Sequence, residues 1–212
     1  MRHVIWDWNG TLVDDLHVVV DAVNVSLAGF GAGPIDADDY RDHYTRPVRV
    51  FYDRLLNRAV TDDEWRRIDT TFHTNYSNGL HRVALTEDAE AAIRAVKAAG
   101  ATQSILSMWW QEDLVPEVRR HGLDDIMVRI DGNTLEGGET KAALLEMHLS
   151  HLPARSEPVL IGDATDDAHA AASAGIPAVI YDGGSHHREL LESLGVPVVG
   201  TLTEAVMVGL AL

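Results

Sequence analysis

From about residue 85 to the C-terminus, short apolar runs alternate with helical patterns, and this alternation restricts the possible folds more than any other feature. Strands are predicted at residues 103–106, 126–130, 159–162, 178–181 and 196–199. Helices are predicted at 86–100, 112–121, 141–149, 167–174, 187–194 and 202–210, and Thr86 is predicted to cap the first of them. The run Val4-Ile5-Trp6 predicts one more buried strand near the N-terminus. Strands that alternate with helices form a parallel sheet covered on both faces, so the expected class is α/β, with a Rossmann-like three-layer core.

Residues 15–84 interrupt this alternation, because they carry helical patterns without convincing strands. Asp36 and Thr61 are predicted to cap helices, and Thr61 with Glu64 has the form of a capping box. We therefore divide the chain into a core, formed by residues 1–14 and 85–212, and an inserted helical cap, residues 15–84.

The composition excludes several classes of protein. The chain of 212 residues has a net charge of -16, which disfavours binding to nucleic acid or to an anionic membrane. It contains no cysteine, so disulfides, thiolate catalysis and zinc–thiolate sites are excluded. No apolar run approaches the length of a membrane span, and the first residues lack the pattern of a signal peptide. We expect a cytoplasmic protein, and the oligomeric state is left open.

Polar residues follow the predicted strands at positions where a parallel sheet binds its ligands. Asp7 comes directly after the first strand and begins the run Asp7-Trp8-Asn9-Gly10-Thr11-Leu12. A carboxylate at such a strand end can bind a metal ion, or attack an electrophile and form a covalent intermediate. Ser107 and Asp163 follow two further strands, and these ends converge at one edge of the sheet.

The loop that begins at Asp163 is rich in carboxylates, with Asp166 and Asp167 close behind. Such a cluster needs a cation, and ligand sets made only of oxygen favour Mg²⁺. Lys141, at the start of a predicted helix, is a counter-charge for a bound anion, and the hydroxyls of Thr11 and Ser107 can donate to the same anion. Together these residue types indicate phosphoryl transfer.

In these motifs the sequence resembles the haloacid dehalogenase superfamily, specifically its phosphatase branch, which includes phosphoglycolate phosphatase-like enzymes with a helical cap. The resemblance implies that Asp7 is the nucleophile, that Ser107 binds the phosphoryl group and that Lys141 neutralises it. It also implies Mg²⁺ as cofactor, held by Asp7, the Asn9 carbonyl, Asp163 and Asp167. The implied substrate is a small phosphorylated metabolite.

One position departs from the family pattern. Phosphatases of the family carry a second aspartate, the general acid and base, where this chain has Asn9. The side chain of asparagine cannot ionise, so the departure leaves alternatives open. The chain could be a phosphotransferase, a phosphatase restricted to good leaving groups, or a disabled phosphate-binding or regulatory protein. Asp14 could replace the missing acid, although Asp14 and Asp15 are better explained as part of the link to the cap.

Two arginines of the cap, Arg46 and Arg49, lie on either side of Pro47, where a helix break is predicted. The resemblance implies that cap residues in this region face the active site and select the substrate, whereas a solvated position explains them equally well. His186 and His187 are expected in a surface loop at the start of a helix. Asp166 could take the metal-binding role given to Asp167, although the family spacing favours Asp167.

Overall fold

The computed structural model describes residues 1–134 and 140–212, and its centre is a six-stranded sheet with the order β5-β4-β1-β6-β7-β8. All neighbouring strands in this sheet are parallel, which confirms the predicted α/β class. The strands are β1 (Arg2–Trp6), β4 (Thr102–Trp110), β5 (Ile130–Asn133), β6 (Glu157–Gly162), β7 (Ala178–Tyr181) and β8 (Val198–Val199).

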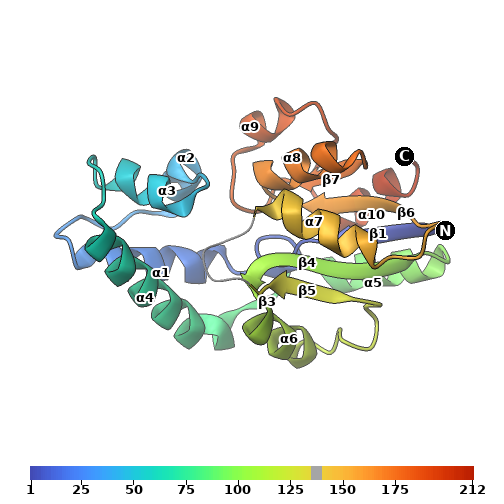
Figure 1. The fold of residues 1–212 in the computed structure, drawn as a ribbon, viewed down its shortest axis with the longest axis horizontal. Helices are drawn as coiled ribbons and strands as arrows, with labels where there is room; N and C mark the ends of the chain where they lie inside the picture. Colours follow the sequence, from blue (N-terminus) through green and yellow to red (C-terminus); the bar gives the residue numbers. More distant parts are fainter. Residues whose placement is uncertain (135–139) are drawn as a thin grey trace.

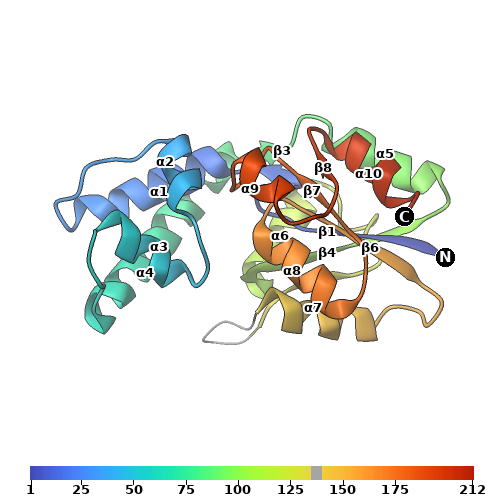
Figure 2. The same cartoon turned by 90° about the horizontal axis from the view of Figure 1, so that it is seen from above.

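Helices cover both faces of the sheet, so the core has three layers (Figure 2). One face packs against α5 (Ala89–Ala98), α6 (Gln111–Arg120) and α10 (Leu202–Gly209), and the other against α7 (Lys141–Ser150) and α8 (Thr165–Ala174). Successive side chains of β1 alternate between these layers: Val4 and Trp6 join the first cluster and Ile5 the second. Burial on both faces explains why the strands read as continuous apolar runs. The short helix α9 (Arg188–Glu192) follows β7.

The inserted segment is helical, with a hydrophobic cluster of its own, and it lies beside the core in Figures 1 and 2. Its helices are α1 (Leu16–Ala28), α2 (Ala37–His43), α3 (Val48–Leu55), α4 (Asp62–Gly79) and η1 (Leu80–Arg82). The predicted caps are confirmed, because Asp36 and Thr61 each form a capping box at the start of α2 and α4. Helices α1 and α4 pack side by side and form the connection to the core (Figure 1).

The two crossings between core and cap lie together in a short antiparallel ladder that the sequence did not predict. Strand β2 (Val13–Asp14) pairs with β3 (Ala84–Leu85), with Val13 opposite Leu85 and Asp14 opposite Ala84. The hydroxyl of Thr86 donates to the carbonyl of Thr11 at 2.5 Å, so a side-chain hydrogen bond also connects the two segments that join the cap to the core.

Three sequence expectations are wrong in detail. Thr86 does not cap the following helix, because its hydroxyl is used on Thr11 and the N-cap position of α5 is Asp88. The N–H groups of Ile126 and Met127 donate to the Leu123 carbonyl in a turn, and β5 begins only at Ile130, although the Val128 N–H already donates to the Gln103 carbonyl of β4. Strand β4 continues to Trp110, so Ser107 lies within a strand, at a shift in the register between β4 and β5.

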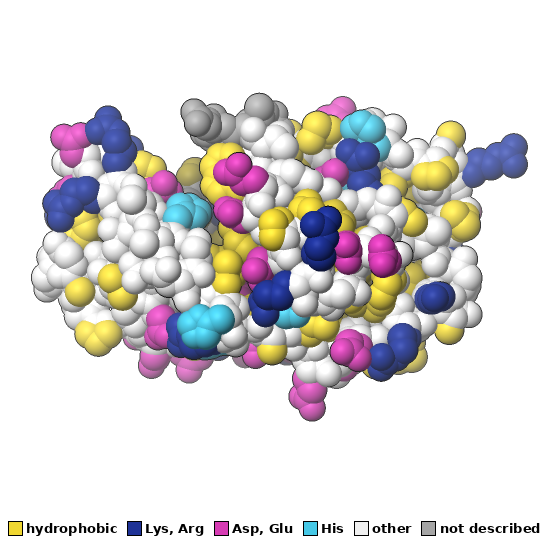
Figure 3. All heavy atoms as spheres, turned by 90° about the horizontal axis from the view of Figure 1, so that it is seen from below, with side chains coloured by type: hydrophobic (Ala, Val, Ile, Leu, Met, Phe, Trp, Pro, Cys, Tyr) yellow, Lys and Arg dark blue, Asp and Glu magenta, His cyan; other side chains and the backbone are white. Residues whose placement is uncertain are grey.

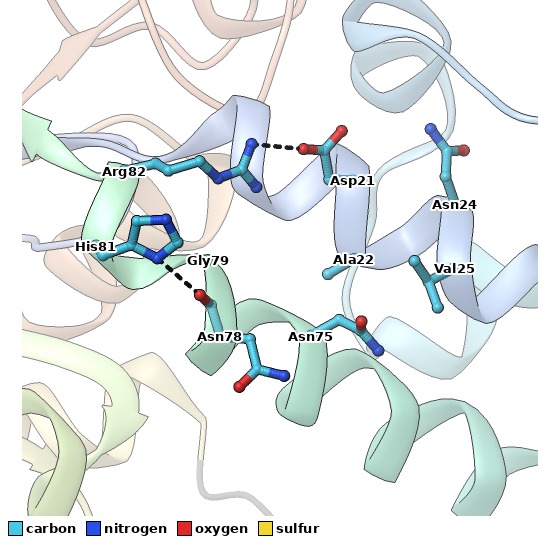
Figure 4. A pocket seen from close by; sticks show the side chains of 9 residues that line it. All are labelled: Asp21, Ala22, Asn24, Val25, Asn75, Asn78, Gly79, His81 and Arg82. Atoms are coloured by element: carbon cyan, nitrogen blue, oxygen red, sulfur yellow. Dashed lines mark hydrogen bonds and ion pairs between the residues drawn. The ribbon is translucent and has the colours of Figure 1, made fainter.

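Two surface features lie apart from the predicted site. A pocket between α1, the end of α4 and η1 is lined by Asp21, Asn24, Asn75, Gly79 and Arg82, among others, and by none of the predicted site residues (Figure 4). On the face in Figure 3, basic side chains lie scattered among acidic ones. No helix in the described residues is both long and apolar enough to cross a membrane.

Candidate active site

Three carboxylates meet at the edge of the sheet that faces the cap. Asp7 follows β1 directly, Asp163 follows β6, and Asp167 lies in the first turn of α8. One oxygen from each lies within 4.8 Å of the others, and all three residues are buried. The convergence follows from the parallel sheet, because neighbouring strands β1 and β6 end at the same edge.

Lys141 brings a positive charge into this cluster. It is the first residue of α7, where Thr140 caps the helix by accepting a hydrogen bond from the Ala143 N–H. Its Nζ lies 2.5 Å from Oδ1 of Asp7 and 3.0 Å from Oδ1 of Asp167. An ammonium group at a helix N-terminus opposes the helix dipole, so these carboxylates are what hold it there.

One ammonium group does not neutralise three buried carboxylates. Burial raises the pKa of Asp7 to about 6, although the nearby charge of Lys141 opposes that rise. Burial, with the charge of Asp167 added, raises the pKa of Asp163 to about 7. Burial also raises the pKa of Asp167 to about 7 against the opposing charge of Lys141. Burial alone would lower the pKa of Lys141, but the charges of Asp167 and Asp7 outweigh it and raise that pKa. The cluster therefore has an excess of negative charge that a further cation would balance.

The packing around Asp163 fixes its carboxylate. Its oxygens accept hydrogen bonds from the Thr11 hydroxyl at 3.2 Å and from the Ser185 N–H at 2.7 Å. Gly10 has a φ of +71°, and a Cβ built there would lie 2.6 Å from Oδ2 of Asp163, so only glycine fits. The Thr11 hydroxyl, predicted to contact an anion, is thus used within the protein.

The three carboxylates form a donor set that could hold a metal ion. Oδ1 of Asp167 is buried, and Lys141 forms an ion pair with it at 3.0 Å. All the side-chain donors in the group are carboxylate oxygens, the ligands that a hard divalent cation such as Mg²⁺ prefers. The residues present therefore fit such an ion.

Asn9 lies beside the cluster but its amide nitrogen is turned toward the cap. Its Nδ2 donates to Oδ2 of Asp15 at 2.8 Å and to the hydroxyl of Tyr76 at 2.7 Å. The Ser107 hydroxyl donates to Oδ1 of Asn9 at 3.4 Å and accepts from the Trp109 N–H at 3.1 Å. Ser107 is thus brought close to Asn9, two residues after Asp7, despite its position within β4.

The two cap arginines have different surroundings. Arg46 forms an ion pair across to the core, with its Nε 3.1 Å from Oδ2 of Asp166. Arg49 instead pairs with Asp62 at 2.8 Å and donates to the carbonyl of Val60, both within the cap. Asp166 therefore faces the cap, whereas Asp167 belongs to the carboxylate cluster.

Other contacts also join the cap to the loop after β7. The Arg41 Nε donates to the Gly184 carbonyl at 3.0 Å, and His187 lies 3.1 Å from Asp42. His186 is buried with its ring 5.3 Å from that of Tyr44, so the expectation of a surface loop is wrong for this residue. The cap covers the loop because charged side chains of α2 and the aromatic ring of Tyr44, directly after α2, contact it.

Comparison with known proteins identifies the family. The family model described as haloacid dehalogenase-like hydrolase matches residues 4–181, which is most of the chain. The chain belongs to the haloacid dehalogenase-like hydrolases.

Curated relatives of this hydrolase include two phosphoglycolate phosphatases. The protein from Synechococcus elongatus is 26% identical over 198 residues, which cover 90% of this chain and 88% of that protein. The protein from Colwellia psychrerythraea is 27% identical over 201 residues, which cover 91% and 89%. The fold is shared with a crystal structure described as a predicted phosphatase from Clostridium acetobutylicum, with a TM-score of 0.85 at 18% identity over 100% of this chain and 99% of that one.

Two residues beside the site of this haloacid dehalogenase-like hydrolase had no site role in the sequence analysis. Asp15 is predicted only as part of the link to the cap, and Tyr76 lies within the predicted cap without a role of its own. The run Asp14-Asp15, placed just after Asn9, was the available signal for Asp15. Nothing in the local sequence marks Tyr76, because it meets Asp15 across 61 positions of the chain.

Proposed function

We propose that this hydrolase is a Mg²⁺-dependent phosphatase that acts on a small phosphorylated metabolite through a covalent intermediate on Asp7. The observation that carries the proposal is the position of Asp7, buried between the ammonium of Lys141 and the carboxylates of Asp163 and Asp167. This arrangement places a nucleophilic oxygen next to groups that can hold and neutralise a phosphoryl group.

In the proposed reaction a carboxylate oxygen of Asp7 attacks phosphorus, and the bond from phosphorus to the leaving oxygen breaks. The leaving group takes up a proton from solvent as it is released, and water then attacks phosphorus, breaks its bond to the Asp7 oxygen and releases inorganic phosphate. Lys141 contributes charge to the phosphoryl oxygens, and Ser107 would turn its hydroxyl from its long, 3.4 Å hydrogen bond with Asn9 to donate to them. Thr11 supports Asp163 through its hydroxyl, which differs from the direct contact with phosphate expected earlier.

The metal would be held by Asp7, Asp163 and Asp167, together with the Asn9 carbonyl that the family resemblance implies. When bound, Mg²⁺ would neutralise charge on the phosphoryl oxygens and on the carboxylates themselves. We also propose that residues 15–84 act as the cap and residues 1–14 and 85–212 as the core, with closure of the cap excluding water from the first step.

Phosphoglycolate is the first substrate to test, since the curated relatives that the chain matches are phosphoglycolate phosphatases. That molecule carries a carboxylate beside its phosphate. Arg46 crosses from the cap to the core, where it pairs with the carboxylate of Asp166, so it is the proposed contact for such a second anionic group.

The test is release of inorganic phosphate from phosphoglycolate and from p-nitrophenyl phosphate, with Mg²⁺ and with a chelator present. We expect activity that chelation removes and that Asp7→Asn abolishes. Asp125→Asn is the matched control, because that carboxylate is exposed and far from the site in sequence. Full activity of Asp7→Asn would overturn the assignment of the nucleophile.

A second function, phosphoryl transfer to an acceptor other than water, is favoured by one observation. Asn9 donates both amide hydrogens to Asp15 and Tyr76, so it supplies no acid or base to the site. An aspartyl-phosphate that water attacks slowly can persist and pass its phosphoryl group to an alcohol. Acid quenching during turnover, followed by mass measurement of the Asp7 peptide, distinguishes a persistent intermediate from rapid hydrolysis.

A further inference from the structure

We propose that Asp15 is a positioning residue for the reaction at Asp7, and that it acts by fixing the side-chain amide of Asn9 through a ring of hydrogen bonds shared with Tyr76. This inference rests on the proposed phosphatase function for its kinetic consequences, while the ring itself is a feature of the structure. Asn9 and Asp15 would then be a matched pair, in which changing either residue alone lowers the catalytic rate.

The ring contains three side chains from three parts of the chain. Nδ2 of Asn9 donates to Oδ2 of Asp15 at 2.8 Å and to the Tyr76 hydroxyl at 2.7 Å. The Tyr76 hydroxyl in turn donates to Oδ2 of Asp15 at 2.7 Å, and the Gly10 N–H donates to Oδ1 of Asp15 at 2.9 Å. The two amide hydrogens of Asn9 and the hydroxyl hydrogen of Tyr76 are each donated once, so every hydrogen bond of the ring has one donor and one acceptor.

The ring determines which way the amide of Asn9 faces. A carboxylate only accepts hydrogen bonds, so the NH₂ group of Asn9 must point to Asp15. The reversed amide would place Oδ1 of Asn9 against a carboxylate oxygen and would leave two buried acceptors facing each other. Oδ1 is therefore directed to the other side, where the Ser107 hydroxyl donates to it at 3.4 Å.

The position of Asp15 in helix α1 gives independent support. Asp15 occupies the N-cap position, where aspartate ordinarily accepts from the first free N–H groups of the helix. Within the described chain its side chain makes no such capping bond, and both its oxygens serve Gly10, Asn9 and Tyr76 instead. Asp15 is 2% exposed and Tyr76 is 4% exposed, so the ring is also shielded from competing water.

This orientation gives Asn9 a defined task beside the reacting group. Its Oδ1 is an acceptor, so it can orient the hydroxyl of a leaving group or of an attacking water, although it cannot transfer a proton. Because Tyr76 belongs to helix α4 of the cap, the same ring makes the orientation of Asn9 depend on the position of the cap.

The matched pair predicts strong coupling between two substitutions. Asn9→Asp alone would place two carboxyl groups where the amide and carboxylate now lie 2.8 Å apart. Asp15→Asn alone would remove the acceptor that selects the amide orientation. The double variant Asn9→Asp with Asp15→Asn restores one carboxyl group and one amide in the same pair of positions.

The experiment measures kcat and KM for p-nitrophenyl phosphate in wild type, both single variants, the double variant, Tyr76→Phe and Asp14→Asn. We expect Asp15→Asn to lower kcat about 10- to 100-fold with KM changed little, as for a misplaced group beside the reacting atoms. Asn9→Asp should also lose activity, and the double variant should recover most of the loss. Asp14→Asn is the matched control, because Asp14 is the adjacent residue of the same type and is exposed.

Two kinetic outcomes would overturn the proposal. One is a wild-type kcat in Asp15→Asn, and the other is a fold-loss of kcat in the double variant equal to the product of the two single fold-losses. The side-chain amide signals of Asn9 in an NMR spectrum give a readout that needs no turnover. Slow exchange of these hydrogens in wild type, lost in Asp15→Asn at unchanged melting temperature, supports the ring even if no phosphate ester is hydrolysed. Rapid exchange in wild type contradicts it.

Discussion

Nζ of Lys141 lies 2.5 Å from Oδ1 of Asp7, although 134 positions separate the two residues in the chain. Both side chains are buried, so each depends on the other for neutralisation. The same ammonium also reaches Asp167. Lys141 is therefore placed to compensate charge on the carboxylates before the substrate binds and on the phosphoryl group afterwards.

Lys141→Ala should lower kcat/KM for phosphate esters by at least about 100-fold, because it removes a charge that a developing phosphoryl anion needs. Lys141→Arg should recover only part of this, since a planar guanidinium places its charge differently from a compact ammonium. Steady-state kinetics of both variants, at a melting temperature close to that of wild type, provide the check. Unchanged kinetics in Lys141→Ala would contradict the role.

Saturating Mg²⁺, at about a hundred times its Kd, should raise the melting temperature by roughly 5–10 °C, since the ion balances the excess charge of the folded site. Asp163→Asn should abolish this increase, whereas Asp125→Asn should retain it. The measurement is differential scanning calorimetry with Mg²⁺ and with chelator. A shift that survives Asp163→Asn would assign the ion to another place.

Arg46→Ala should raise KM for phosphoglycolate about 10- to 100-fold and leave p-nitrophenyl phosphate little affected, because only the first substrate has a carboxylate for the guanidinium. Arg49→Ala is the matched control, since its guanidinium pairs with Asp62 inside the cap. Equal effects of Arg46→Ala on the two substrates would show that this residue does not select the substrate.

A second buried polar network lies in the core, away from the carboxylate cluster. Nε2 of His3 lies 2.8 Å from the Ser104 hydroxyl, which lies 2.7 Å from Nε2 of His148, and Nδ1 of His148 lies 2.7 Å from Oδ2 of Asp131. The order of serine, histidine and aspartate is that of a hydrolytic triad, but Ser104 and His148 are fully buried. We interpret this network as structural.

Stability should fall in acid because of His3. Burial, with a smaller contribution from His148, lowers the pKa of His3 from its usual 6.5 to about 4. Between these two pH values His3 binds a proton in the unfolded chain but not in the folded chain. The free energy of unfolding therefore declines as the pH falls from about 6.5 to 4. The contribution of His3 to this decline is up to about 3 kcal/mol. His3→Gln should lose less stability than wild type in urea titrations over this range, whereas exposed His17→Gln should match wild type. Identical pH profiles for wild type and His3→Gln would argue against this contribution.

Local patterns predicted most of the fold. The apolar runs around Ile5 and Leu160 indicated strands buried on both faces, and Asp36 and Thr61 marked helix starts by hydrogen bonds to residues three positions on. Because parallel strands end at one edge of the sheet, the sequence predicts that Asp7 and Asp163 lie close together, and in the structure they belong to one cluster.

The remaining features depend on contacts between distant parts of the chain. The ladder of β2 and β3 is only two residues long on each side, too short for any periodic signal. The strand predicted over 126–130 begins later, at Ile130, because the N–H groups of Ile126 and Met127 are bonded to the Leu123 carbonyl in a turn. Likewise, the contact of Asp15 with Tyr76 is set by the packing of α4 against α1, which a residue pattern does not encode.

The ladder that joins the cap to the core also makes the insertion exchangeable. Since the chain leaves the core at Asp14 and returns at Ala84, directly opposite, an insertion of any length whose ends are adjacent could connect these two positions without disturbing the six-stranded sheet. A family built in this way can acquire new substrates by replacing the inserted segment alone. In this chain such an exchange would also remove Tyr76, so a transplanted cap would have to bring its own hydroxyl to Asp15.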